Sequence, residues 1–135
     1  ARRQGRIHTF EGCPETAEIA QKNFKILDVD NIKIHVGNID KTLPALLPKV
    51  GKVDVAYLDA NHQYEPTLRY FSQILPAMSE EGLLIFDDIH WSEGMQRAWQ
   101  EVVAHPEVSL SVDLFAFGLA FVSKKYSKEH FVLRF

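Results

Sequence analysis

The stretch that most constrains the fold is residues 83–91, which read LLIFDDIHW. Its first four residues are all apolar, and an apolar run this short predicts a strand that is buried on both faces of a sheet. The run ends at two adjacent carboxylates, Asp87 and Asp88, with His90 shortly after them. Because open α/β folds bind ligands at the carboxyl edge of a parallel sheet, we expect these three side chains to face a site.

An earlier segment, residues 53–62, has the same form. Its sequence VDVAYLDANH has a mostly apolar body that ends at Asp59 and is followed by Asn61 and His62. The carboxyl ends of parallel strands meet at one edge of the sheet. We therefore expect Asp59 near Asp87 and Asp88.

Composition limits the class of protein. A chain of 135 residues with 46% hydrophobic content predicts a single domain spanning residues 1–135. The net charge of -3 argues against a nucleic-acid surface that depends on bulk charge. The single cysteine, Cys13, excludes an internal disulfide, and no apolar stretch approaches the roughly 20 residues that span a bilayer. We therefore expect a cytoplasmic protein without a nucleic-acid or membrane partner.

Strand and helix patterns alternate along most of the chain. A strand is expected at residues 7–10, a helix from Pro14 to Leu27, and a half-exposed strand at 32–36. A short, proline-bounded helical turn at 43–47 follows. The apolar face of the next helix runs from Leu68 to Met78, and that of the last helix from Met95 to Val103.

The pattern changes near the C-terminus. Apolar and polar residues alternate over residues 108–114, and residues 117–122 form a second strand pattern with no helix between them. Strands joined this tightly are antiparallel neighbours. Residues 131–135 are expected to add a last strand or to pack on the surface. The predicted fold is α/β, a mostly parallel sheet with helices on both faces and an antiparallel C-terminal hairpin.

These segments, in this order, resemble the class I S-adenosylmethionine-dependent methyltransferases, in particular their small-molecule O-methyltransferase branch. The segments that carry the resemblance are TFEGCPETAEIAQKNF, IHVGNID, VAYLDANHQY, LLIFDDIHW and DLFAFGLAFV. The resemblance implies a Rossmann-like fold, an enzyme, S-adenosylmethionine as cofactor and methyl transfer to a small molecule, expected at an oxygen.

One feature of that family is missing. Its glycine-rich turn, which holds the methionine part of the cofactor, has no counterpart before Glu11. We interpret the chain as a C-terminal fragment that lacks the central strand and that turn, and that is inactive alone. This leaves a gap between the strands at Ile7 and Val53, which we expect a second copy, in a symmetric dimer, or another segment to close.

The resemblance assigns the cofactor to two strand ends. Glu11 is expected to accept hydrogen bonds from the ribose hydroxyls, and Gly12 to border the adenine. Four residues after the next strand are expected to line the adenine ring: Gly37, Asn38, Ile39 and Asp40. Alternatively, Glu11 is an acid that the helix dipole favours, and Gly37 and Asn38 form an ordinary turn.

Three carboxylates form the candidate metal site. Asp59, Asp87 and Asp88 would repel one another unless a cation lay between them, and oxygen ligands favour Mg²⁺. The resemblance to catechol-type methyltransferases implies the same ion. Alternatively, Asp59 contacts the amino group of the cofactor, and Asp88 caps a helix that starts near Trp91.

His62 is the candidate catalytic base, since it lies where those enzymes carry a lysine and histidine accepts protons near neutral pH. The resemblance also gives Asp59 a catalytic role and places His90 and Trp91 on the acceptor side. His62 could instead be structural. For the whole chain, the alternatives are a nicotinamide-binding Rossmann domain and a non-catalytic binding or oligomerisation module.

Overall fold

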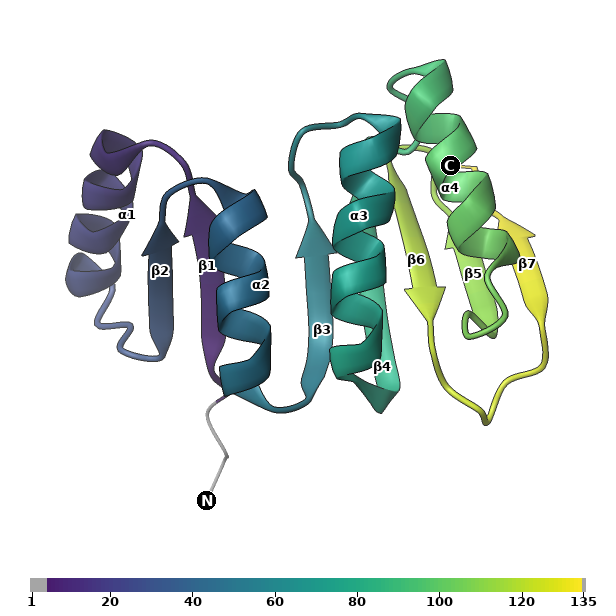
Figure 1. The fold of residues 1–135 in the computed structure, drawn as a ribbon, viewed down its shortest axis with the longest axis horizontal. Coiled ribbons are helices and arrows are strands. Elements are labelled where there is room, and N and C mark those ends of the chain that lie inside the picture. The colour runs from purple at the N-terminus through teal and green to yellow at the C-terminus, as the bar shows by residue number, and fades with distance from the viewer. Residues whose placement is uncertain (1–4, 135) are drawn as a thin grey trace. The chain divides into compact units, whose positions relative to one another are not determined.

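The computed structural model describes residues 5–134, which form two compact units, one ending at Lys49 and the other beginning at Val50. The first unit contains two strands and two helices (Figure 1): β1 (Ile7–Glu11), α1 (Pro14–Ile26), β2 (Ile32–Val36) and α2 (Ile39–Val50). β1 and β2 pair in parallel, with Ile7 opposite Ile32 and Glu11 opposite Val36. The strand ends at Glu11 and Val36 therefore lie side by side.

The helices of the first unit differ from the expectation at two points. Pro14 does occupy the first turn of α1, where its missing N–H costs no hydrogen bond. Leu27, however, is the C-cap residue and is 69% exposed, so its place on the apolar face was wrong. The short turn expected at 43–47 is also wrong, because α2 continues through Pro44 and Pro48 as a 12-residue helix.

The second unit contains the longer sheet, whose strand order is β3-β4-β6-β5-β7. Its strands are β3 (Val53–Leu58), β4 (Met78–Asp87), β5 (Leu110–Asp113), β6 (Phe117–Phe121) and β7 (Glu129–Val132). β3 pairs in parallel with β4, β6 is antiparallel to both β4 and β5, and β7 is parallel to β5. The α/β class with an antiparallel C-terminal hairpin is confirmed. A last strand is present, but it begins and ends earlier than the predicted tail at 131–135, of which Phe135 lies outside the described residues.

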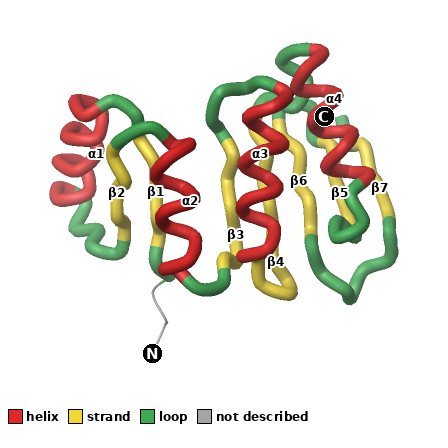
Figure 2. Tube along the Cα trace, in the orientation of Figure 1, coloured by secondary structure: helices red, strands yellow, loops and turns green. Residues whose placement is uncertain are grey.

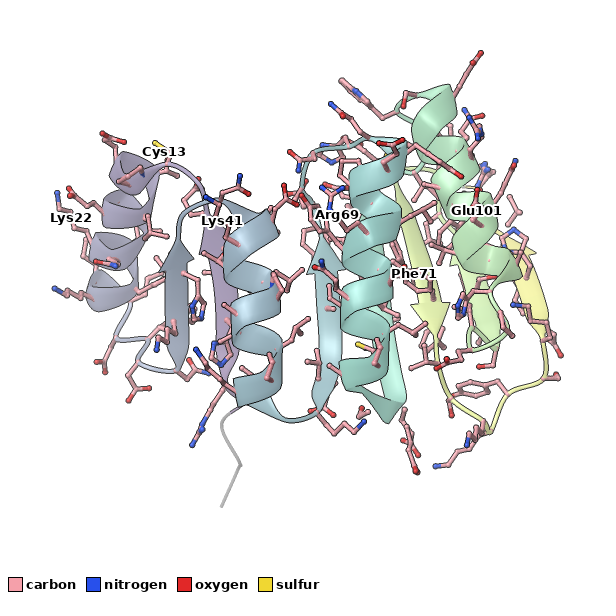
Figure 3. The ribbon with its side chains drawn as sticks, in the orientation of Figure 1. Cys13, Lys22, Lys41, Arg69, Phe71 and Glu101 are labelled. Atoms are coloured by element: carbon pink, nitrogen blue, oxygen red, sulfur yellow. The ribbon has the colours of Figure 1, made fainter. Side chains whose placement is uncertain are left out.

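Two helices, α3 (Tyr64–Ile74) and α4 (Glu93–Ala104), lie on one face of this sheet (Figure 2). The core between them and the sheet is aromatic: Phe71, labelled in Figure 3, lies 6.0 Å from Phe86, and Phe86 lies 5.7 Å from Trp99, centroid to centroid. Leu84 and Phe86 of β4 are 0% and 1% exposed. One face of the apolar run at 83–86 is therefore buried under the helices, whereas Leu83 and Ile85 on its other face are only half-buried, so the expected burial on both faces is found for one face in the described residues.

The end of α3 was wrongly predicted. The helix ends at Ile74, residues Leu75–Ala77 form a 3-10 turn, and Met78 is the first residue of β4. Pro76 explains the break, since it has no N–H to continue the helical ladder. Met78 is still buried, at 5% exposed, so the apolar pattern was correct while the element was not.

Within residues 5–134, β1 pairs only with β2, and β3 pairs only with β4. Each of these two strands therefore has one edge without a strand partner in the described part of the chain. On β3, the side chains of Val55 and Tyr57 are more than half exposed. That a second copy or another segment pairs with these free strand edges stays a prediction. None of the described helices is both long and apolar enough to cross a membrane.

Candidate functional site

Two neighbouring strands of the second unit carry the acidic residues to the same sheet edge. β3 and β4 run parallel, with Leu58 opposite Phe86. Asp59 follows Leu58 directly, and Asp87 follows Phe86. The register therefore puts the two carboxylates next to each other at the carboxyl end of the sheet.

The backbone after each strand is turned sharply. Asn61, His62 and Asp88 have positive φ angles of 64°, 35° and 51°, which side chains other than glycine seldom adopt. The side-chain amide of Asn61 donates to the hydroxyl of Tyr70 at 2.5 Å and so holds its loop against α3. Such strain is typical of sites that position side chains for binding or catalysis.

The residues gathered there are Asp59, His62 and Asp87. One ligand atom from each lies within 4.8 Å of the other two. Nε2 of His62 is 3.2 Å from Oδ1 of Asp59 and 3.8 Å from Oδ2 of Asp88. This nitrogen is buried and, within residues 5–134, has no hydrogen-bond partner of acceptable geometry. A buried imidazole nitrogen that faces carboxylates without a hydrogen bond to them fits a site for a cation or a proton donor.

The carboxylates perturb the groups around them. Burial and then a hydrogen bond with Asp87 raise the pKa of Asp59, and the negative charge of Asp87 raises it further. Burial followed by a hydrogen bond to Asp87 raises the pKa of Tyr57 to about 12. Negative charge is therefore crowded at this edge, which favours either a shared proton or a bound cation.

The donor set differs from the expected one. Two carboxylates and an imidazole suit a divalent ion that accepts both oxygen and nitrogen ligands, such as Mn²⁺ or Zn²⁺, as well as Mg²⁺ with water. Asp88 is outside this three-residue cluster, and its backbone N–H donates to Oδ1 of Asp87 at 3.1 Å. The sequence analysis gave His62 only the role of a base, although Asp59-x-x-His62 is a spacing that brings both side chains together.

Asp88 does not cap the following helix, so that alternative was wrong. α4 begins at Glu93, and its N-cap is Ser92, whose hydroxyl accepts the N–H of Met95 at 3.2 Å. Asp88 instead belongs to the turn before it, in which its carbonyl accepts the N–H of Trp91 at 2.9 Å. Trp91 itself is 73% exposed.

The candidate cofactor residues lie in the first unit. Glu11 ends β1, and the N–H of Gly37 donates to its carbonyl at 2.9 Å. Oε1 of Glu11 accepts the N–H of Cys13 at 2.8 Å. A side chain on Gly12 would meet no atom within 4 Å, whereas Gly37 has a φ of +128°, which glycine alone adopts readily. The two strand ends therefore form one open turn region.

The four residues after β2 form the start of α2. Oδ1 of Asn38 accepts the N–H of Asp40 at 2.8 Å, and Ile39 is the first residue of the helix. Turn and cap geometry therefore accounts for Gly37 and Asn38 without a ligand, as the alternative states. The adenine role stays a prediction.

Asp113 was missed by the sequence analysis, which treated the polar residues of 108–114 only as the alternating partners of apolar ones. Asp113 and Ser111 are 5% and 1% exposed, and they are the residues that face α4. Nε2 of His90 lies 2.8 Å from Oδ2 of Asp113. Alternation shows that a strand has two faces, but not which face a helix covers.

Comparison with known proteins points to one family. The sequence model of a family described as a methyltransferase domain matches residues 1–89. No curated relative matches the chain. Among solved structures, cofactor-bound Rv0187 from MTB is similar with a TM-score of 0.76 and 25% identity, over 90% of this chain and 63% of that one.

Two O-methyltransferases share the fold. The enzyme from Bacillus cereus, solved in complex with SAH, has a TM-score of 0.73 and 22% identity over 88% of this chain and 63% of its own. TomG from Streptomyces achromogenes, involved in tomaymycin synthesis and solved with SAM, has a TM-score of 0.72 and 23% identity over 88% of this chain and 62% of its own. The chain thus spans less than two thirds of the length of these structures.

Proposed function

Because the chain belongs to this methyltransferase family, we propose that the protein is a class I S-adenosylmethionine-dependent O-methyltransferase, which transfers a methyl group to an oxygen of a small-molecule acceptor. The observation that carries the proposal is the cluster of Asp59, His62 and Asp87 at the carboxyl end of β3 and β4. Ligands of open α/β folds bind at this edge. The family match favours this function over the nicotinamide-binding alternative.

S-adenosylmethionine, when bound, supplies an electrophilic methyl group on a sulfonium sulfur. Glu11 would accept hydrogen bonds from the ribose hydroxyls, since its Oε1 is already fixed by the N–H of Cys13 and its other oxygen remains available. The space beside Gly12 would take the adenine edge, next to residues 37–40. These roles are supported by the family match and by the open turn at these strand ends.

The acceptor hydroxyl must lose its proton as the methyl group is transferred. His62 would take it in the metal-free site, with the carboxylate of Asp59, 3.2 Å from Nε2, stabilising the imidazolium that forms. Asp59 thereby acts as the partner of the base. Holding the acceptor in line with the methyl group would contribute the larger part of the rate enhancement.

Asp59, Asp87 and His62 would also hold a divalent cation, with Asp88 adjacent. When bound, such an ion lowers the pKa of an acceptor hydroxyl, so that no side chain need act as a strong base. The two roles of His62 exclude each other, because a nitrogen lone pair that binds a metal ion cannot take a proton. Metal content and activity must therefore be measured on the same preparation.

Calorimetric titration of the full protein with S-adenosylmethionine tests the cofactor. We expect binding, and we expect Glu11→Gln to weaken it about ten- to hundredfold, since a hydrogen bond to a charged group contributes about 1.5–3 kcal/mol. The matched control is Glu18→Gln, an exposed glutamate on α1. Binding of NAD in place of S-adenosylmethionine would support the nicotinamide alternative, and binding of neither would support a non-catalytic module.

Chelation tests the metal. If the ion is used, a chelator lowers methyl transfer, added Mg²⁺ or Mn²⁺ restores it, and His62→Asn reduces bound metal together with activity. If chelation has no effect while His62→Asn abolishes transfer, His62 is the base and the hypothesis of a bound cation is wrong.

The single domain over residues 1–135 and the symmetric dimer stay predictions. Light scattering of the purified protein tests the dimer.

A further inference from the structure

A cavity of about 310 Å³, half open to solvent, lies in the second unit beside α4, and its lining does not include the Asp59 cluster. It runs between α4 and the strands β5 and β7, which Figure 1 shows next to one another. The lining residues are His90, Gln96, Trp99, Gln100, Val103, Ala104, Asp113 and His130. Its volume is near the lower end of the roughly 300–1,000 Å³ of small-molecule pockets, which fits a ligand of one ring.

The strand face under this part of α4 is polar, which is unusual for a helix packed on a sheet. Ser111 and Asp113 are almost fully buried there, and burying such groups costs free energy unless they are hydrogen-bonded. Each of them fixes a histidine at the cavity. Oγ of Ser111 is 2.8 Å from Nδ1 of His130, and Oδ2 of Asp113 is 2.8 Å from Nε2 of His90. The buried polar groups therefore orient two imidazole rings.

The charge of Asp113 is already balanced inside the protein. Burial alone would raise the pKa of Asp113, but hydrogen bonds from Arg134, from the N–H of Phe115 and from His90 outweigh it and lower the pKa to about 2. Nη1 of Arg134 is 2.9 Å from Oδ1. An ionised carboxylate only accepts hydrogen bonds, so Nε2 of His90 must carry the proton. In the neutral ring, Nδ1 then keeps a free lone pair.

The ring of Phe115 supports this arrangement from outside. It stacks on His90 at 5.5 Å with an angle of 21°, and the guanidinium of Arg134 lies 5.5 Å from its centroid. Phe115 has a positive φ of 71° and is 62% exposed. A strained, exposed aromatic residue that covers a fixed histidine is more typical of a binding site than of a core.

Trp99 forms a rigid wall of the cavity. The ring lies so close to β6 that a Cβ on Gly118 would come within 2.8 Å of three of its carbons. Trp99 is 5% exposed, and its Nε1 has no hydrogen-bond partner within residues 5–134. A buried donor without an acceptor costs free energy, which the close packing of Trp99 against β6 must offset.

The rim offers two further polar groups. Gln96 and Gln100 are four residues apart on α4, so their side chains lie on the same side of the helix. No protein group in the described part of the chain hydrogen-bonds either side-chain amide. Each amide has both a donor and an acceptor, which matches the dual character of a hydroxyl group.

We propose that this cavity binds an uncharged ring bearing several hydroxyl groups, and that this ring is the non-reacting part of the methyl acceptor. We expect a neutral ligand for two reasons. The negative charge of Asp113 repels an anion, and because Arg134 already pairs with this carboxylate, it attracts a cation only weakly. His90, only three residues after Asp87, links the cavity to the carboxyl edge of the sheet. The assignment of the ring to the acceptor rests on the methyltransferase function proposed above.

The test is an NMR titration of the ¹⁵N-labelled full protein with methyl α-D-glucopyranoside. The indole N–H signal of Trp99 should shift saturably, and that of the exposed Trp91 should not. The double variant Gln96→Leu/Gln100→Leu should raise the dissociation constant about tenfold, through loss of its hydrogen bonds. The matched control, Gln21→Leu on the exposed side of α1, should leave the constant unchanged. The methyl glucuronide, an anion of the same size, should bind about tenfold more weakly.

Three results would overturn the inference: no saturable shift of the Trp99 signal, equal binding of the glucuronide, or unchanged binding by the double variant. Titration with S-adenosylmethionine separates this site from the proposed function. If the cofactor binds and the glucopyranoside does not, the proposed ligand site in the cavity is wrong, while the proposed methyltransferase function still stands. If the glucopyranoside binds and the cofactor does not, the cavity is a ligand site, but its ligand is not part of a methyl acceptor.

Discussion

Replacing Asp113 by asparagine should destabilise the second unit by about 2 kcal/mol near neutral pH. The pKa of Asp113 is lowered from 3.8 to about 2. A difference of one pKa unit corresponds to about 1.36 kcal/mol, so the shift corresponds to about 2 kcal/mol. The side chain is only 7% exposed, so solvent screens this interaction little. Asparagine keeps the shape but not the charge that Arg134 and His90 face.

The pH dependence of this effect has a definite sign. Because the folded-state pKa is the lower one, the stabilisation by Asp113 is fully present above the unfolded pKa near 3.8 and is lost as the pH falls through about 2. The difference between wild type and Asp113→Asn should thus be constant from pH 7 to 5 and shrink steadily below pH 4.

Urea unfolding followed by tryptophan fluorescence measures this difference, because Trp99 is buried in the same unit. The background variant Trp91→Phe removes the signal of the exposed indole. Asp54→Asn, at an exposed aspartate of β3, is the control and should change stability by less than about 0.5 kcal/mol. A difference for Asp113→Asn that stays the same from pH 7 to 2.5 would refute the reasoning, since it would be steric rather than electrostatic.

Two further predictions concern packing and the acidic edge. Gly118→Ala should destabilise the second unit by about 1–3 kcal/mol, because the new methyl group would overlap the ring of Trp99; Gly5→Ala, where a Cβ meets nothing within 4 Å, is the control in the same unfolding assay. In an ultraviolet titration, Tyr57 should ionise near pH 12, and Asp87→Asn should lower that value, because the carboxylate holds the phenol in its neutral form. Ionisation of Tyr57 at the usual value near 10 in the wild type would contradict the second prediction.

The sequence by itself determined the type and order of most strands and helices. The apolar run at residues 83–86 located the second half of β4, and the alternation at 32–36 located β2, because these patterns are typical of strands. The presence of a proline did not by itself show whether a helix ends there. Pro44 and Pro48 lie inside α2, whereas Pro76 follows the end of α3, and only the surrounding packing separates these two outcomes.

The candidate site shows the same division. Asp59 and Asp87 were predictable, because each ends an apolar strand and parallel strands bring their ends together. The place of His62 beside them depends on the positive φ angles of Asn61 and His62, which no residue pattern specifies. The partnership of His90 with Asp113 joins residues 23 positions apart through the pairing of β4, β6 and β5. Such contacts follow from which face of the sheet α4 covers, and only the tertiary structure decides that, because alternation leaves both faces of a strand equally possible.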